Sequence, residues 1–162
     1  SPMGLGPCGY SDADAIHAVL TSPDVLIPGG DDWASISRLD ARRLITSPAI
    51  RIFMPQPETV FLFVRKSAVM WEIHVGIKKG SDREKGIASA VESARWMIEN
   101  EGCRKLISYI PAFHKASLVF AKMCGMIEEG RLVEAHLQDD VLHDLVVMGA
   151  TEKRLKELYG GN

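Results

Sequence analysis

The spacing of apolar residues changes from a helical to a strand-like period near Ala49. Before this point, apolar side chains recur every three or four residues, which predicts two helices. After it, they alternate with polar residues or form short β-branched runs, which predicts three strands, with a turn at residues 55–58 where two prolines fall. The expected elements are helices over 12–21 and 33–45 and strands over 49–54, 59–64 and 69–77.

The second half of the chain alternates between helical and strand-like segments. The expected elements are a helix over 83–99, a strand over 105–110, a helix over 115–124, strands over 126–137 and 141–148, and a short helix from Thr151. The apolar stripe of the first of these helices consists of Ile87, Val91, Ala94 and Ile98. A strand, a helix and a strand in succession imply a right-handed parallel crossover. The predicted fold class is therefore α/β (α+β): a mixed, mostly antiparallel central sheet with helices on both faces and one parallel β-α-β crossover.

One strand of this set leads through a polar loop directly into a helix, over residues 71–100. Its alternation puts Glu72 and His74 on one face and apolar side chains on the other. The turn Arg83–Ala88 that opens the helix is basic and contains Gly86. The first N–H groups of a helix lack partners and its N-terminus carries positive partial charge, so this turn is suited to bind a phosphate group.

Composition is that of an ordinary globular protein. With 162 residues, 46% hydrophobic and 25% charged, we expect a single domain over 1–162, with residues 1–7 and 160–162 flexible. The net charge of −2 gives no general attraction to nucleic acid or to an anionic membrane, and the longest apolar run, Val60–Val64, is too short to cross a bilayer. Three widely spaced cysteines predict neither disulfides nor a metal site and fit a reducing cytoplasm.

The basic turn and its surroundings resemble those of a known family. Arg83-x-x-Gly86-x-Ala88 is similar to the R/Q-x-x-G-x-G/A turn of the GCN5-related N-acetyltransferases, and it stands between a strand and a helix as it does there. The helix end Lys122–Met126 is also similar to that of the family. The resemblance covers residues 8–150, and its last part looks like members carried by bacteriophages.

The resemblance implies that the protein binds acetyl-CoA. In the family, the turn holds the pyrophosphate of coenzyme A, and the preceding strand pairs with the pantetheine arm and polarises the thioester. Small residues at Gly86 and Ala88 would let the phosphate approach the backbone, and Arg83 and Lys85 would supply charge. The cofactor-binding residues implied in this way are Val75, Gly76, Ile77, Arg83, Glu84, Lys85, Gly86, Ile87, Ala88, His114 and Ser117.

The resemblance also implies a catalytic base, because an ammonium group is not a nucleophile. Histone-type members carry a glutamate eleven residues before the first motif position. Glu72 stands at that distance from Arg83, with His74 beside it on the same face. Either of these two residues could take the proton, directly or through a water molecule.

Two positions depart from the family pattern. His114 stands where an asparagine is common, and Ala121 stands where a tyrosine commonly protonates the leaving thiolate. Either Tyr109, His114, Ser117 or water replaces that tyrosine, or the chemistry is weak or absent.

Two hypotheses follow. The first is a cytoplasmic N-acetyltransferase that moves an acetyl group from acetyl-CoA, by direct attack, to a primary amine of a small molecule, a protein lysine or a protein N-terminus. Acidic residues at 31–32 and 139–140 favour a cationic acceptor, and the resemblance implies a homodimer as one form of the protein. The second hypothesis is a catalytically weak or inactive protein of this fold that acts in phage particle (head) assembly or binds a host protein, in the host cytoplasm if phage-encoded.

Overall fold

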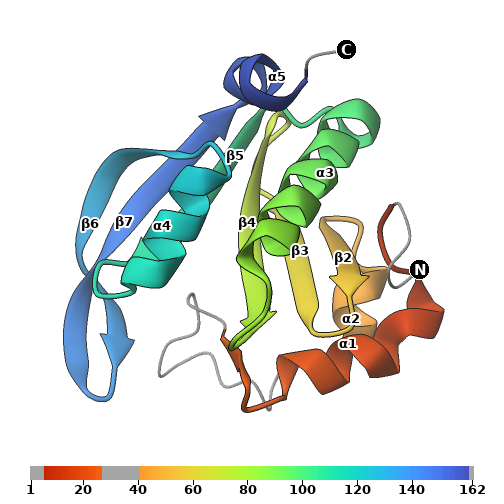
Figure 1. Ribbon diagram of the computed structural model, residues 1–162, viewed down its shortest axis with the longest axis horizontal. Helices are drawn as coiled ribbons and strands as arrows, with labels where there is room; N and C mark the ends of the chain where they lie inside the picture. Colours follow the sequence, from red (N-terminus) through yellow and green to blue (C-terminus); the bar gives the residue numbers. More distant parts are fainter. Residues whose placement is uncertain (1–5, 27–40, 161–162) are drawn as a thin grey trace.

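The computed structural model describes residues 6–26 and 41–160, whose strands form one seven-stranded sheet with helices on both faces (Figure 1). The helices are the 3-10 helix η1 (Tyr10–Asp12), α1 (Ala13–Leu20), α2 (Ala41–Thr46), α3 (Arg83–Glu101), α4 (Lys115–Met123) and α5 (Glu152–Tyr159). The strands are β1 (Val25–Leu26), β2 (Ile50–Gln56), β3 (Thr59–Arg65), β4 (Met70–Lys78), β5 (Lys105–Pro111), β6 (Ile127–Gln138) and β7 (Val141–Thr151).

The sheet has the strand order β2-β3-β4-β5-β7-β6, and β1 pairs with the C-terminal end of β4. β4 and β5 are parallel, and α3 is the crossover between them. Every other pair among the described strands is antiparallel. The predicted fold class, a mostly antiparallel sheet with one parallel crossover and helices on both faces, is therefore confirmed.

Each face of the sheet has its own apolar core. In β3, Phe61 and Phe63 belong to the larger core, which lies under α3, α4 and α5 and includes the fully buried Trp71. At the alternate positions of β3, Val60 and Leu62 belong to the smaller core under α1 and α2. Because helices cover both faces of the sheet at β3, its residues are apolar on both sides, and residues 60–64 form a continuous apolar run.

Strand β2 is longer than the sequence predicts at its C-terminal end. It continues through Pro55 to Gln56, so the predicted turn over 55–58 is wrong in its first half. β2 lies at the edge of the sheet, where the missing N–H of Pro55 removes no ladder hydrogen bond. Its register with β3 shifts between Phe53 and Gln56, which accommodates the proline.

Some predictions fall outside the described ranges. Residues 33–40 of the second predicted helix, the acidic residues 31–32, and the terminal residues 1–5 and 161–162 lie there. The last part of that helix is described and is helical, as α2.

Helix α3 begins after its N-cap, Asp82, and ends at Gly102, whose φ of 64° suits glycine. Of its predicted apolar stripe, Ala94 is buried, whereas Ile87, Val91 and Ile98 are half-buried, and Ile98 packs against the larger core. The residues that α3 buries are Gly86, Ala90, Ser93, Ala94 and Met97. Most of these are small, so the helix lies close to its neighbours, and side-chain size rather than hydrophobicity determines the buried face.

Candidate active site

Strands β4 and β5 separate after a short parallel pairing. They pair only at residues 70–72 of β4 and 105–107 of β5, and the last pair is Glu72 with Ile107. Beyond it, β5 stays paired with β7 as far as Pro111, whereas β4 stays with β3. We call this opening the fork. Between the fork and β1, residues 73–76 of β4 have no strand partner on this edge within the described part of the chain, so backbone N–H and C=O groups there can bind a ligand.

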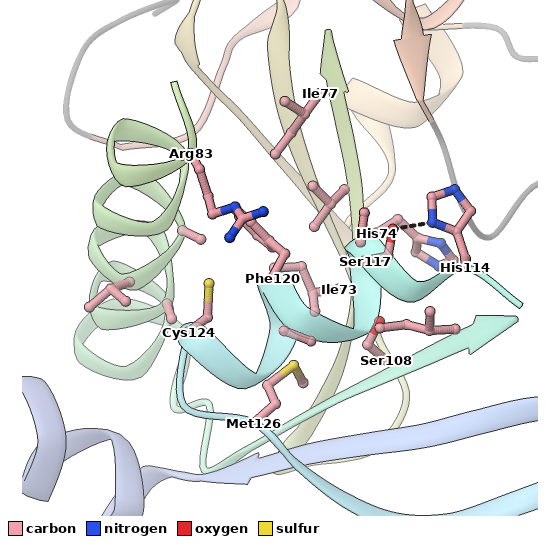
Figure 2. A pocket seen from close by; sticks show the side chains of 18 of the residues that line it. Ile73, His74, Ile77, Arg83, Ser108, His114, Ser117, Phe120, Cys124 and Met126 are labelled. Carbon is pink, nitrogen blue, oxygen red and sulfur yellow. Dashed lines mark hydrogen bonds between the residues drawn. The ribbon is translucent and has the colours of Figure 1, made fainter. Parts of the chain in front are cut away.

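A cavity of about 330 Å³ lies over the fork, between α3 and α4 (Figure 2). Its outer end is polar and includes His74, Arg83, His114 and Ser117. Its inner end, which extends toward α5, is lined by Ala90, Ala94, Leu106, Ala150 and Leu155. The cavity therefore joins a polar opening to an apolar interior.

The cavity brings together only some of the residues that the sequence indicates. Those that line it are His74, Val75, Ile77, Arg83, Gly86, His114 and Ser117. Those that do not are Glu72, Gly76, Glu84, Lys85, Ile87 and Ala88. The lining also includes Asp82, Phe120 and the apolar residues of the inner end, which the sequence reasoning missed.

Glu72 and His74 form a pair on β4. Nε2 of His74 lies 2.8 Å from Oε2 of Glu72, and Nζ of Lys66 lies 3.4 Å from the other carboxylate oxygen. Burial favours a raised pKa for Glu72, but the hydrogen bond from His74 and the charges of His74 and Lys66 outweigh it and lower the pKa below its ordinary value. The side chain of Glu72 is 12% exposed and that of His74 is 38% exposed. The imidazole of His74 is therefore the more accessible member of the pair, and the Glu72 carboxylate is the more buried one.

The N-terminus of α3 is already capped from within the chain. Oδ1 of Asp82 accepts hydrogen bonds from the N–H groups of Glu84, at 3.0 Å, and Lys85, at 3.3 Å. From the sequence, these N–H groups are expected to be open to a phosphate. In the structure, a carboxylate occupies two of them, and its negative charge lies where an anion would bind. An aspartate directly before the basic turn is the signal that sequence reasoning could have used.

Gly86 has a packing role that the motif alone does not reveal. A Cβ atom on this residue would lie 3.3 Å from Cε2 of Phe120 and 3.7 Å from Cδ1 of Ile77. α3 thus contacts α4 and β4 closely at this point because Gly86 has no side chain. Ala88, predicted to be small for the sake of a phosphate, is exposed.

The start of α4 supplies a second polar pair at the outer end. Oγ of Ser117 lies 2.8 Å from Nδ1 of His114, the N-cap residue (Figure 2). Across the cavity, Nη1 of Arg83 approaches the sulfur of Met123 at 3.7 Å. Ala121 lines the cavity and has no group that donates a proton, and Tyr109 of β5 also belongs to the lining.

The cysteines are poor nucleophiles. Burial raises the pKa of Cys124, which lines the cavity, to about 12. It also raises the pKa values of Cys8 and Cys103 to about 11. Since the thiolate is the reactive form, a covalent acyl-cysteine intermediate is disfavoured.

Among the residues that the structure describes, no three His, Cys, Asp or Glu side chains are grouped as a metal site requires. No helix in the described ranges has the length and apolar content needed to cross a membrane.

The sequence matches no protein-family model and no curated protein. Solved structures do match. Mutant forms of the spermidine/spermine N-acetyltransferase from Vibrio cholerae give a TM-score of 0.73 at 14% identity, covering 96% of each chain. The same organism's spermidine N-acetyltransferase in complex with CoA and spermine gives 0.66 at 14% identity, covering 92% of this chain and 95% of that one. Its dodecameric form gives 0.66 at 17% identity, covering 98% of each. The protein therefore has the fold of these N-acetyltransferases.

Proposed function

We propose that the protein is an N-acetyltransferase that moves an acetyl group from acetyl-CoA to a primary amine by direct attack. The observation that carries this proposal is the fork: an open edge of β4 faces a cavity that contains His74, itself paired with Glu72. A neighbour of the same fold binds CoA and spermine.

The cavity suits coenzyme A in two respects. The unpaired edge of β4 offers N–H and C=O groups to the amides of a pantetheine arm, and Arg83 offers a positive charge at the outer end. The Asp82 carboxylate opposes an anion there, so pyrophosphate binding requires the cap of α3 to rearrange or to share its donors. Acetyl-CoA would supply the activated acyl group, as a thioester.

The chain's own residues supply proton transfer. His74 lines the cavity and takes the proton of the attacking amine, while Glu72 orients the imidazole and stabilises its charged form. N–H groups on the open edge of β4 can donate to the oxyanion that forms on attack. A proton for the leaving thiolate can come from Tyr109 or from the His114–Ser117 pair, because both line the cavity.

The acceptor is an amine of a small molecule, a protein lysine or a protein N-terminus. The spermine in the neighbouring structure favours a polyamine among these. We place the protein in the cytoplasm, where its three free thiols would stay reduced. Exposed Leu132, Val133 and Leu142 on the β6–β7 hairpin support self-association, which sedimentation would test.

A second candidate is a protein of this fold that has lost transfer and serves in phage particle assembly or binds a host protein. Ala121 favours it, since this position offers no proton to a leaving thiolate.

The deciding experiment is an assay of thiol release from acetyl-CoA with a panel of amines: spermidine, a lysine peptide and a peptide with a free N-terminus. Amine-dependent thiol release and an acetylated product in the mass spectrum would support the enzyme. His74→Gln is the matched control and should abolish most of the release. Cofactor binding without transfer to any amine would instead favour the second candidate.

A further inference from the structure

The inner end of the cavity is an apolar space that acetyl transfer does not need. We propose that it binds the hydrocarbon chain of an acyl group longer than acetyl, with hexanoyl as the length it fits. The site then accepts longer acyl-CoA thioesters as well as acetyl-CoA. This inference rests on the proposed function, because the chain is attached to the same thioester.

The inner end lies directly beyond the fork. α3 runs back along β4 from Gly86, which lies beside Ile77, so Ala90 and Ala94 are about 6 Å and about 12 Å further along the helix. On the sheet side, Leu106 pairs with Trp71, one residue past the Glu72–Ile107 pair where the fork closes, and Ala150 pairs with Leu106. An acyl chain whose carbonyl lies at the fork would therefore point toward this space.

Small side chains leave the space open. Ala90 and Ala94 come from α3, Ala121 from α4 and Ala150 from β7, and all four are almost completely buried. Large residues at these positions would fill the interior to normal packing density. An apolar cavity costs free energy when nothing occupies it, and it binds hydrocarbons readily.

The chemistry of the lining selects the ligand. Ala90, Ala94, Leu106, Ala150 and Leu155 at the inner end carry no charged or hydrogen-bonding side chain, and Cys124 and Met126, which also line the cavity, add only weak hydrogen-bonding sulfur atoms. A cationic amine or a phosphate there would lose its hydration without compensation, so neither fits. Ala90 and Ala94 are about 6 Å apart along the helix, and because an extended hydrocarbon is a zigzag, roughly five C–C bonds span this distance. That length matches a hexanoyl chain from its carbonyl carbon to its methyl group.

The test is calorimetric titration of the full chain with CoA, acetyl-CoA and hexanoyl-CoA. We expect hexanoyl-CoA to bind up to roughly 200-fold more tightly than acetyl-CoA, because four additional CH₂ groups are buried. Ala94→Leu and Ala150→Leu, each of which fills the inner end, should remove this gain and leave acetyl-CoA affinity within about twofold. Ala18→Leu, at an exposed position of α1 on the other face, is the control and should keep the gain.

The outcomes separate this inference from the proposed function. If CoA itself does not bind, the proposed function fails. If CoA and acetyl-CoA bind but hexanoyl-CoA binds no more tightly, the acyl-chain site is wrong and acetyl transfer still stands. The same conclusion applies if thermal unfolding shows that Ala94→Leu is folded and it nevertheless keeps the hexanoyl preference.

Discussion

Nε2 of His74 lies 2.8 Å from the carboxylate of Glu72, two residues earlier on β4. Both residues face the side of the sheet that α1 covers, since they pair in register with Leu62 and Val64 of β3, and Leu62 packs there. Val75 and Ile77, at the alternate positions, belong to the side of α3 and α4. The pair therefore stands at the fork, where a thioester approaching from α3 and an amine from the opposite face could meet.

The first prediction concerns proton transfer by this pair. His74→Gln should lower kcat by roughly 10²- to 10⁴-fold, because the group that takes the proton is lost. Glu72→Gln should lower kcat less, because the imidazole remains and loses only its orienting carboxylate. CoA affinity should change by less than about twofold in both variants. If Glu72→Gln instead causes the larger loss, Glu72 is the base and the proposed order of the pair is wrong.

The second prediction is an acid-dependent contribution of Glu72 to stability. Its folded-state pKa is lowered from 4.5. A depressed carboxyl pKa stabilises the fold above the unfolded value, and this contribution is lost as pH falls through the folded value. Near neutral pH, Glu72→Gln should lower the free energy of unfolding by at most about 1 kcal/mol. The effect is small because Lys66 and His74 are partly exposed, and water weakens their attraction to Glu72.

Urea unfolding of Glu72→Gln and of the parent protein at neutral pH and at about pH 3 measures this difference, which should become smaller in acid. Glu99→Gln, at an exposed position of α3, is the control. A difference that persists unchanged in acid would mean that charge on Glu72 is not its source.

The third prediction concerns the Asp82 cap. Asp82→Asn keeps an acceptor for the N–H groups of α3 but removes the negative charge, so CoA affinity should rise roughly 3- to 10-fold.

Asp82→Ala removes the cap altogether and should lower the free energy of unfolding by about 1 kcal/mol. Titration with CoA and urea unfolding measure the two effects. Glu157→Gln controls for net charge, and unchanged or weaker CoA binding by Asp82→Asn would show that the carboxylate does not oppose the pyrophosphate.

The fourth prediction is that native thiols react slowly. A thiol with a pKa of about 11 is only ~0.1% thiolate at about pH 8. An aromatic disulfide reagent should label the native chain slowly and all three cysteines rapidly after unfolding. Cys124→Ser should keep its turnover, in agreement with direct transfer. Rapid labelling of Cys124 in the native protein would reopen a route through an acyl-cysteine.

The strands and the parallel crossover could be predicted because their signals are local. The apolar run 60–64 and the alternation of apolar and polar residues over 69–77 each predict a strand. A helix that connects two neighbouring strands, as α3 connects β4 and β5, indicates that the strands are parallel. The limits of β2 could not be predicted in this way, because Pro55 continues a strand only where that strand lies at an edge. Sequence alone does not say that β2 is the edge.

The candidate site could be predicted where a single segment carries it. Glu72, His74 and Arg83 all belong to one strand–turn–helix unit, so their spacing along the chain was enough to identify them as candidates. The inner end of the cavity could not be predicted, because Ala90, Leu106 and Ala150 meet only through tertiary packing and carry no chemical signal of their own. The most deeply buried face of α3 differs in part from the predicted stripe for a related reason: hydrophobicity favoured the larger side chains, whereas the close contact of Gly86 with Phe120 requires a small one.

The measurement that tests the account most directly is the thermal midpoint of the protein with and without acetyl-CoA. A ligand at 100 times its dissociation constant adds roughly 2.7 kcal/mol, which for a chain of this size raises the midpoint by roughly 5–10 °C. We predict a rise of this order that saturates with cofactor concentration. No change at millimolar acetyl-CoA would contradict cofactor binding at the fork and, with it, the proposed acetyl transfer.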